Sequence, residues 1–282
     1  MRSGSEIAEL QNSEPMITML KAQRRLYTEA KRVKAVAAAI CLGIPIAVTG
    51  VQLMTSLALP SAEVCICAEL VTFAVGIAFA ASAEGKTVTA ASVQQRFDLE
   101  LYGLGSYDSA SLRATVTEAA ARYDKSRSAN PSRLQGWYED AISGLEPIEA
   151  IRCCQRTNLT WSLKLARLWL GILVVASMAC IAFLALSAMS AGISMTNVFF
   201  GATIVEWLTL QLVDGASYFR RLRDLRIVAD FFDVDSEAYV LRLQDQIFEC
   251  RKSRFMVPDF VFRMMHGRYS SIGDEIAAAE RL

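Results

Sequence analysis

The stretch Leu165–Ala188, LARLWLGILVVASMACIAFLALSA, decides which fold this chain can adopt. Apart from Arg167 near its start, it holds no charged residue. Its length exceeds the roughly 20 helical residues that cross a hydrocarbon core of about 30 Å, at about 1.5 Å per residue. The stretch therefore predicts a helix that crosses a membrane.

Three further stretches have the same character: Ala35–Leu59, Ala62–Ala83 and Ile193–Val213. None of them contains Lys or Arg, and 53% of the 282 residues are hydrophobic against only 21% charged. The Pro and Gly residues within them are compatible with membrane helices, which tolerate both. We therefore expect an all-α membrane protein with four transmembrane helices arranged as two hairpins. The alternative is that two of the stretches are buried core helices of a soluble protein.

The basic residues all lie on one side of these stretches. None of the 29 Lys and Arg residues falls in the short loops around Pro60–Ser61 and Met189–Gly192. Because basic segments stay in the cytoplasm, we expect both termini and the long middle segment there, where they build a composite, mainly helical domain. The expected parts are a cytoplasmic N-terminal helix (1–34), transmembrane hairpin 1 (35–83), a cytoplasmic middle segment (84–164), transmembrane hairpin 2 (165–213) and a cytoplasmic helical C-terminal segment (214–282).

Composition and motifs exclude several classes of function. Equal numbers of basic and acidic residues, 29 of each, argue against a DNA- or RNA-binding protein that works by bulk positive charge. His266 is the only histidine, which excludes a metal site built from several histidines. The chain contains no zinc-protease, nucleophile-elbow or Gly-rich phosphate-binding motif. We therefore expect no enzyme, no cofactor and no metal site.

Two clusters of basic residues adjoin the predicted spans. One precedes the first span and one follows the fourth, and their members are Lys21, Arg24, Arg25, Lys31, Arg32, Lys34, Arg220, Arg221, Arg223 and Arg226. Such clusters bind anionic membrane lipid, at about 1 kcal/mol per charge near the surface. The alternative is a pocket for an anionic metabolite where the cytoplasmic segments meet.

Polar residues inside the predicted spans are candidates for lining a pore. Glu69 lies in the second span, and Asn197 and Glu206 lie in the fourth. A charge at mid-bilayer costs about 2.5–3.5 kcal/mol, so such residues usually face a helix bundle or water. In a homo-oligomer each glutamate could form a ring, as in cation-selective pores. The alternative is a protonated glutamate that is hydrogen-bonded between helices.

A set of short sequence blocks in a fixed order takes the interpretation further. The blocks are Gln11-Asn12, KAQRRLYTEAK at 21–31, RFDLELYG at 96–103, Gly136-Trp137-Tyr138, CQRTNLTW at 154–161, LQDQIFECR at 243–251 and Val257-Pro258-Asp259. In this order, around four spans, the chain resembles the four-transmembrane effector family associated with bacterial cyclic-oligonucleotide synthases (SMODS). This resemblance covers nearly the whole chain.

The resemblance implies the killing arm of a CBASS anti-phage system. In such systems a synthase detects infection and makes a cyclic di- or oligonucleotide, and the effector then breaches the bacterial inner membrane so that infection aborts. The family has no well-known catalytic motif, so no catalytic residue is implied. The competing interpretations are a constitutive ion channel or small-solute transporter, in which the membrane glutamates would be coupling sites, and a membrane-tethered scaffold.

A receptor for a cyclic nucleotide needs Arg or Lys for the phosphates, and aromatic or guanidinium planes for the bases. The blocks and their neighbours supply twelve candidates: Arg24, Arg25, Tyr27, Lys31, Arg96, Tyr102, Trp137, Tyr138, Arg152, Arg156, Arg242 and Arg251. The alternative is that the aromatic residues are core, and that Asp98, Asp245 and Asp259 pair with the basic residues to hold the domain together.

Overall fold

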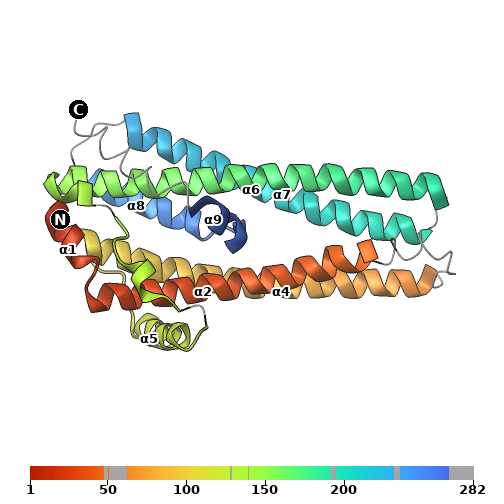
Figure 1. Cartoon of the computed structure of the whole chain (residues 1–282), viewed down its shortest axis with the longest axis horizontal. Helices are drawn as coiled ribbons and strands as arrows, with labels where there is room; N and C mark the ends of the chain where they lie inside the picture. Colours follow the sequence, from red (N-terminus) through yellow and green to blue (C-terminus); the bar gives the residue numbers. More distant parts are fainter. Residues whose placement is uncertain are drawn as a thin grey trace.

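The structure, a computed structural model, describes residues 1–47, 50, 62–127, 129–138, 140–191, 195–231 and 236–266. Every regular element in these ranges is a helix (Figure 1), which confirms the predicted all-helical chain. The elements are α1 (Gly4–Leu10), α2 (Glu14–Ala38) continued by η1 (Ala39–Gly43), α4 (Ala62–Tyr102), α5 (Ala110–Asp124), η2 (Pro131–Leu134), η3 (Asp140–Gly144), α6 (Pro147–Ala191), α7 (Met195–Phe231), α8 (Glu237–Arg251) and α9 (Asp259–His266).

Two long helix pairs run the length of the molecule. Helix α2 packs along α4, and α6 packs along α7 (Figure 1). With 41, 45 and 37 residues, α4, α6 and α7 are about 55–70 Å long, which is well beyond the thickness of a hydrocarbon core. They run without a break through the positions where the sequence divides spans from cytoplasmic segments. The same rigid helices therefore build both ends of the molecule.

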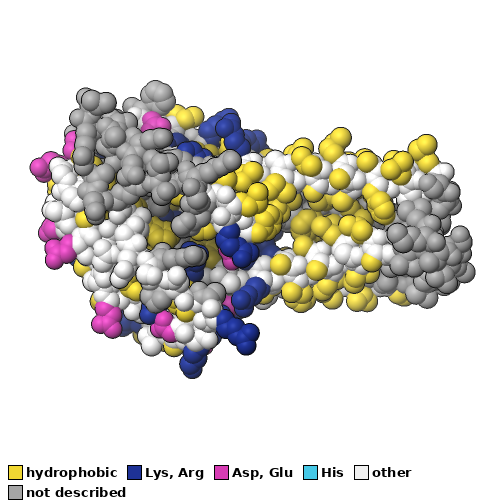
Figure 2. Space-filling view, in the orientation of Figure 1, with side chains coloured by type: hydrophobic (Ala, Val, Ile, Leu, Met, Phe, Trp, Pro, Cys, Tyr) yellow, Lys and Arg dark blue, Asp and Glu magenta, His cyan; other side chains and the backbone are white. Residues whose placement is uncertain are grey.

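The two ends of the molecule differ in chemistry. On the face that Figure 2 draws, the side chains of Lys, Arg, Asp and Glu gather over one end, whereas the paired helices of the other end present apolar side chains. Phe73 and Ile77 of α4 and Val175 and Met178 of α6 are all more than half exposed there. An exposed apolar surface of this extent is typical of a membrane or protein contact.

Among the described residues, one helix is long and apolar enough to cross a membrane, over Pro147–Met189. It contains the stretch from which the membrane class was inferred. The topology of four spans stays a prediction.

The charged end has a core of its own. Helix α8 inserts between the two helix pairs, and α9 lies beside it (Figure 1). One apolar cluster, with Leu20, Phe97 and Tyr102 at its centre, joins α1, α2, α4 and α5 to the start of α6, and a second joins α6, α7 and α8. Helix α4 stops at Gly103, whose φ of 67° is the left-handed conformation that glycine adopts without a Cβ clash. The Leu104 N–H then donates to the Leu99 carbonyl at 3.0 Å, which closes the helix end.

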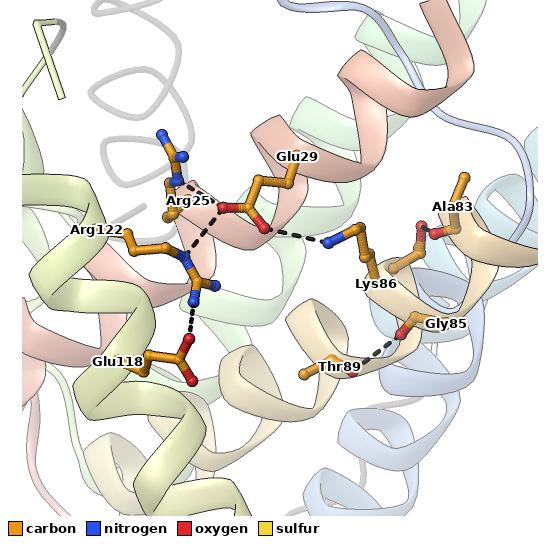
Figure 3. A network of polar contacts seen from close by, with 9 residues as sticks. Arg25, Glu29, Ala83, Gly85, Lys86, Thr89, Glu118 and Arg122 are labelled. Carbon is orange, nitrogen blue, oxygen red and sulfur yellow. Dashed lines mark hydrogen bonds and ion pairs between the residues drawn. The ribbon is translucent and has the colours of Figure 1, made fainter. Parts of the chain in front are cut away.

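Glu29 of α2 ties three elements together at this end (Figure 3). Its carboxylate accepts from Arg25 Nε at 2.7 Å, from Lys86 Nζ of α4 at 3.3 Å and from Arg122 Nε of α5 at 3.2 Å. Arg122 also pairs with Glu118 of its own helix. Burial alone would raise the pKa of Glu29, but the hydrogen bond from Arg25 and the charges of Arg122 and Lys86 outweigh it and lower the pKa below 4.5. An ionised Glu29 therefore contributes to the docking of α5, beside the apolar residues of this helix in the core.

Replacing this carboxylate should loosen α5 selectively. We expect Glu29→Gln to accelerate hydrogen exchange of the α5 amides by about tenfold, because about 1.4 kcal/mol of charge-assisted hydrogen bonding is lost. Since the folded pKa is lowered, this contribution is present above pH 4.5 and disappears as the pH falls through the folded value. Glu118→Gln is the control, because Glu118 is 74% exposed and pairs with Arg122 alone among the described ion pairs, so exchange should change less than about twofold. Equal effects of the two variants would contradict this role of Glu29.

Candidate functional site

A cavity of about 900 Å³ lies between the two helix pairs at the charged end. Its walls come from α2, α4, α6, α7 and α8, from residues 134–138 and from the segment 253–263. This volume lies within the range of about 300–1,000 Å³ that is typical of small-molecule sites. Among the described residues, no group of three His, Cys, Asp or Glu side chains could hold a metal ion.

Helix α2 contributes a stripe of polar and aromatic side chains to the cavity. Arg24, Tyr27 and Lys31 follow one another at helical spacing and therefore share one face, together with Leu20. Tyr27 donates to Gln94 Oε1 of α4 at 3.3 Å, and burial raises the pKa of Tyr27 above its ordinary value. Gln23 also lines the cavity; its side chain is 8% exposed, and its Oε1 has no hydrogen-bond partner among the described residues.

A buried polar network at the wall of the cavity joins both helix pairs through α8. Arg251 of α8 pairs with Asp98 of α4 at 2.5 Å, and the Asp98 side chain is 1% exposed. Gln244 of α8 donates to Asp98 at 2.8 Å and to Gln95 at 3.0 Å, and it accepts from Gln155 of α6 at 3.2 Å. Burial acts to lower the pKa of Arg251, but the neighbouring Asp98 outweighs it and raises the pKa. Arg251 therefore stays charged at the cavity wall.

A second node brings together residues from the separate sequence blocks. The Tyr138 hydroxyl lies 2.7 Å from the Tyr102 hydroxyl and accepts from Asn158 at 2.8 Å. The Tyr138 backbone N–H donates to Gln11 at 2.7 Å, and the Gly136 N–H donates to Asn12 at 2.9 Å. Burial is the main cause that raises the pKa of both tyrosines. The contacts between these sequence blocks therefore position Tyr138 and Asn158 at the wall of the cavity.

The structure places six of the twelve ligand candidates at the cavity. These six are Arg24, Tyr27, Lys31, Trp137, Tyr138 and Arg251.

The other six candidates do not line this cavity. Tyr102 lies buried behind Tyr138, and Arg25 pairs with Glu29 on the α5 side. Arg96 pairs with Glu100 at 2.6 Å and Asp108 at 3.0 Å.

The remaining three arginines also have positions away from the cavity. Arg152 is buried in α6, Arg156 donates to the Ala229 carbonyl at 2.9 Å, and Arg242 donates to the Ala238 carbonyl at 3.3 Å. Two of the three aspartates expected to pair with basic residues do so: Asp98 pairs with Arg251, and Asp259 pairs with Lys31. Asp245 instead accepts a hydrogen bond from Gln95 at 3.3 Å.

The pore candidates lie in the apolar half. Glu206 is exposed on α7, whereas Thr203 and Ile204 on the same helix are buried. Glu69 belongs to α4 and Asn197 to α7, and the side chains of both lie outside the described ones. The side chain of His266, the last residue of α9, is also not among the side chains that the structure describes.

Sequence reasoning missed several residues of the cavity. Gln23 precedes the candidate Arg24, and Trp161 closes a quoted block without having been chosen. Phe262 lines the cavity from α9 near Arg24 of α2 and was also missed. Asp259 of α9, which was expected as an ion-pair partner, pairs with Lys31 at the cavity. Sequence reasoning could not place these residues at the cavity, because no local sequence pattern predicts which helices α9 packs against.

Basic side chains gather where the charged end meets the apolar half (Figure 2). Lys34 lies at this boundary and donates to the Arg254 carbonyl. Burial lowers the pKa of Lys34 to about 8, although the nearby Asp214 acts in the opposite direction.

The fold and cavity together define a class: an all-helical protein with one apolar end, whose charged end encloses a cavity lined with cationic and aromatic residues. A family model for the SMODS-associating 4TM effector domain matches residues 5–205. The chain therefore belongs to this family, as the sequence blocks predicted. Membership implies a membrane-associated effector linked to CBASS. No curated protein and no solved structure matches the chain significantly.

The Arg251–Asp98 pair gives a stability prediction. Arg251→Met leaves a carboxylate buried without its counter-charge, which should cost about 3–5 kcal/mol and lower the unfolding temperature of the purified protein. The double variant Arg251→Met/Asp98→Asn should recover most of that loss, because no buried charge remains. Lys252→Met is the control on the same helix end, since Lys252 pairs with the 63% exposed Glu249, and little change is expected. No recovery in the double variant would contradict the role of the buried charge pair.

Proposed function

We propose that the chain is a cyclic-nucleotide-activated effector of a CBASS anti-phage system, which oligomerises and permeabilises the bacterial inner membrane to abort infection. The observation that carries the proposal is a cavity lined by Arg24, Lys31 and Arg251 in a member of the SMODS-associating 4TM effector family. A second messenger made by the associated synthase is the ligand expected for such a cavity.

The cavity supplies both kinds of contact that a cyclic nucleotide needs. Its cations can bind phosphates, and the rings of Tyr27, Trp137 and Trp161 can stack on bases. Its volume of about 900 Å³ suits a ligand larger than a mononucleotide. The absence of a catalytic motif accords with a ligand that is bound and not converted.

The position of the cavity suits a switch. A ligand shifts a conformational equilibrium only through its different affinities for the two states, and a change from 1:99 to 99:1 needs about 5.5 kcal/mol. A ligand here would contact helices of both pairs, so its binding energy would depend on how the pairs are arranged. Several subunits that bind together would supply this free energy more readily than one.

In the active state the apolar ends of several subunits assemble in the membrane. Glu206 is exposed on α7, so in an oligomer it can face a neighbouring subunit or water. Glu69 and Asn197 are the further pore-lining residues of this proposal. The termini and the cavity then lie in the cytoplasm, and the basic residues at the boundary bind anionic lipid headgroups.

Dye release from liposomes tests the proposal. The protein is reconstituted with phosphatidylethanolamine and phosphatidylglycerol, and cyclic di-AMP, cyclic GMP–AMP and cyclic tri-AMP are added separately, with AMP as the negative control. At least one cyclic nucleotide should release the dye. Lys31→Ala should raise the concentration for half-maximal release by about tenfold or more, because one charge-assisted hydrogen bond is lost.

Arg113→Ala is the matched control, because Arg113 is a basic residue on α5 that is 59% exposed and pairs with Asp108 outside the cavity. It should leave the response unchanged. Release that is equal with and without nucleotide would indicate a constitutive channel, and no release with any of the three would contradict the proposed switch.

A further inference from the structure

The segment 253–263, here called the strap, spans the cavity between the two helix pairs. On the first pair, Lys34 of α2 donates to the Arg254 carbonyl, and Arg254 Nε lies 3.1 Å from Glu84 of α4. Thr87 of α4 also donates to the sulfur of Met256 at 3.3 Å. The strap follows α8 in the chain and lies outside the residues matched by the family model.

On the second helix pair the strap makes aromatic contacts. The ring of Phe255 lies 5.6 Å from that of Tyr218 of α7, and the ring of Phe260 lies 5.7 Å from that of Trp169 of α6 at an interplanar angle of 82°. The strap is therefore bound to all four long helices at the level of the cavity.

One strap residue sits as a nucleobase would. The Phe262 ring stacks on Trp161 of α6, with centroids 6.2 Å apart and planes inclined by 25°. The guanidinium carbon of Arg24 lies 5.4 Å from the centroid of the same ring. Proteins also hold unstacked bases by contacts of the base with aromatic rings and with guanidinium groups.

A second strap residue sits as a phosphate would. Asp259 Oδ1 lies 2.6 Å from Lys31 Nζ. The Asp259 carboxylate is therefore paired with the ammonium group to which an anionic ligand would bind. Asp259 and Phe262 lie one turn apart on α9. Arg24 and Lys31 lie two turns apart on the same face of α2, about 10 Å along its axis.

We propose that the strap is a built-in substitute for the ligand, which marks a phosphate subsite at Lys31 and a base subsite beside Arg24 and Trp161. This inference rests on the proposed function. A cyclic nucleotide displaces Asp259 with a phosphate and Phe262 with a base. Displacement also breaks the contacts by which the strap joins the two helix pairs, which couples ligand binding to their arrangement.

The inference predicts that weakening the strap tightens ligand binding. An intramolecular competitor lowers the apparent affinity by the fraction of molecules in which the site is free. Asp259→Asn keeps the shape and removes the charge, so the Kd of whichever cyclic nucleotide binds should fall by about two- to fivefold. Phe262→Ala empties the base subsite, and the Kd should fall by about three- to tenfold. Calorimetric titration of the full chain in lipid nanodiscs with cyclic di-AMP, cyclic GMP–AMP and cyclic tri-AMP measures these values.

Asp124→Asn is the matched control. The Lys21–Asp124 pair joins α2 to α5 at 2.8 Å, with side chains 20% and 50% exposed, against 25% and 50% for Lys31–Asp259. This variant should leave the Kd unchanged. In a Lys31→Ala background, Asp259→Asn should have no further effect, because the two residues then share no interaction.

These titrations distinguish a failure of the strap inference from a failure of the proposed function. If the wild-type protein binds one of the cyclic nucleotides and neither strap variant lowers the Kd beyond the Asp124→Asn control, the strap does not compete and the inference is overturned. If neither the wild type nor either strap variant binds any of them, the proposed function fails and the inference fails with it. Binding that is detectable only after a strap substitution would support both.

Discussion

The buried ion pair between Asp98 and Arg251 is the constraint on which the arrangement of the charged end depends. Asp98 belongs to the first helix pair, and Arg251 ends the helix that inserts between the two pairs. A buried pair adds little net stability over an apolar substitute, but either charge alone is costly. Losing one of the two charges should therefore destabilise the packing of α8 far more than replacing both. Gln244 and Gln155 extend the connection to the second pair.

The cavity follows from this arrangement. Because α8 stands between the helix pairs at the charged end, they are held apart there, and the strap covers the space that remains. In the apolar half α4 and α7 continue as the same unbroken helices. A change in spacing at the cavity can therefore be carried along these helices into the apolar half, without a separate transmitting element.

Much of the fold and part of the site could be predicted from the sequence. The apolar stretches and the helical spacing of Arg24, Tyr27 and Lys31 are local patterns, and local periodicity fixes which residues share a helix face. The remaining positions depend on distant partners. Arg96, Arg156 and Arg242 have the same chemistry as the cavity cations, but their acceptors (Asp108, Ala229 and Ala238) keep them elsewhere. Phe262 was missed, and Asp259 was expected only as an ion-pair partner, because their positions at the cavity depend on where α9 docks, and no spacing along the chain encodes that.

Photo-crosslinking locates the residues that receive the cyclic nucleotide, which we propose are those of the cavity between the helix pairs. Azido derivatives of cyclic di-AMP, cyclic GMP–AMP and cyclic tri-AMP are irradiated with the full chain in nanodiscs, and the modified peptides are identified by mass spectrometry. The account predicts saturable adducts on the peptides that contain residues 23–31 of α2 and 157–161 of α6, suppressed by an excess of the unmodified nucleotide. Saturable adducts confined to surfaces away from the cavity, such as α5, would contradict it.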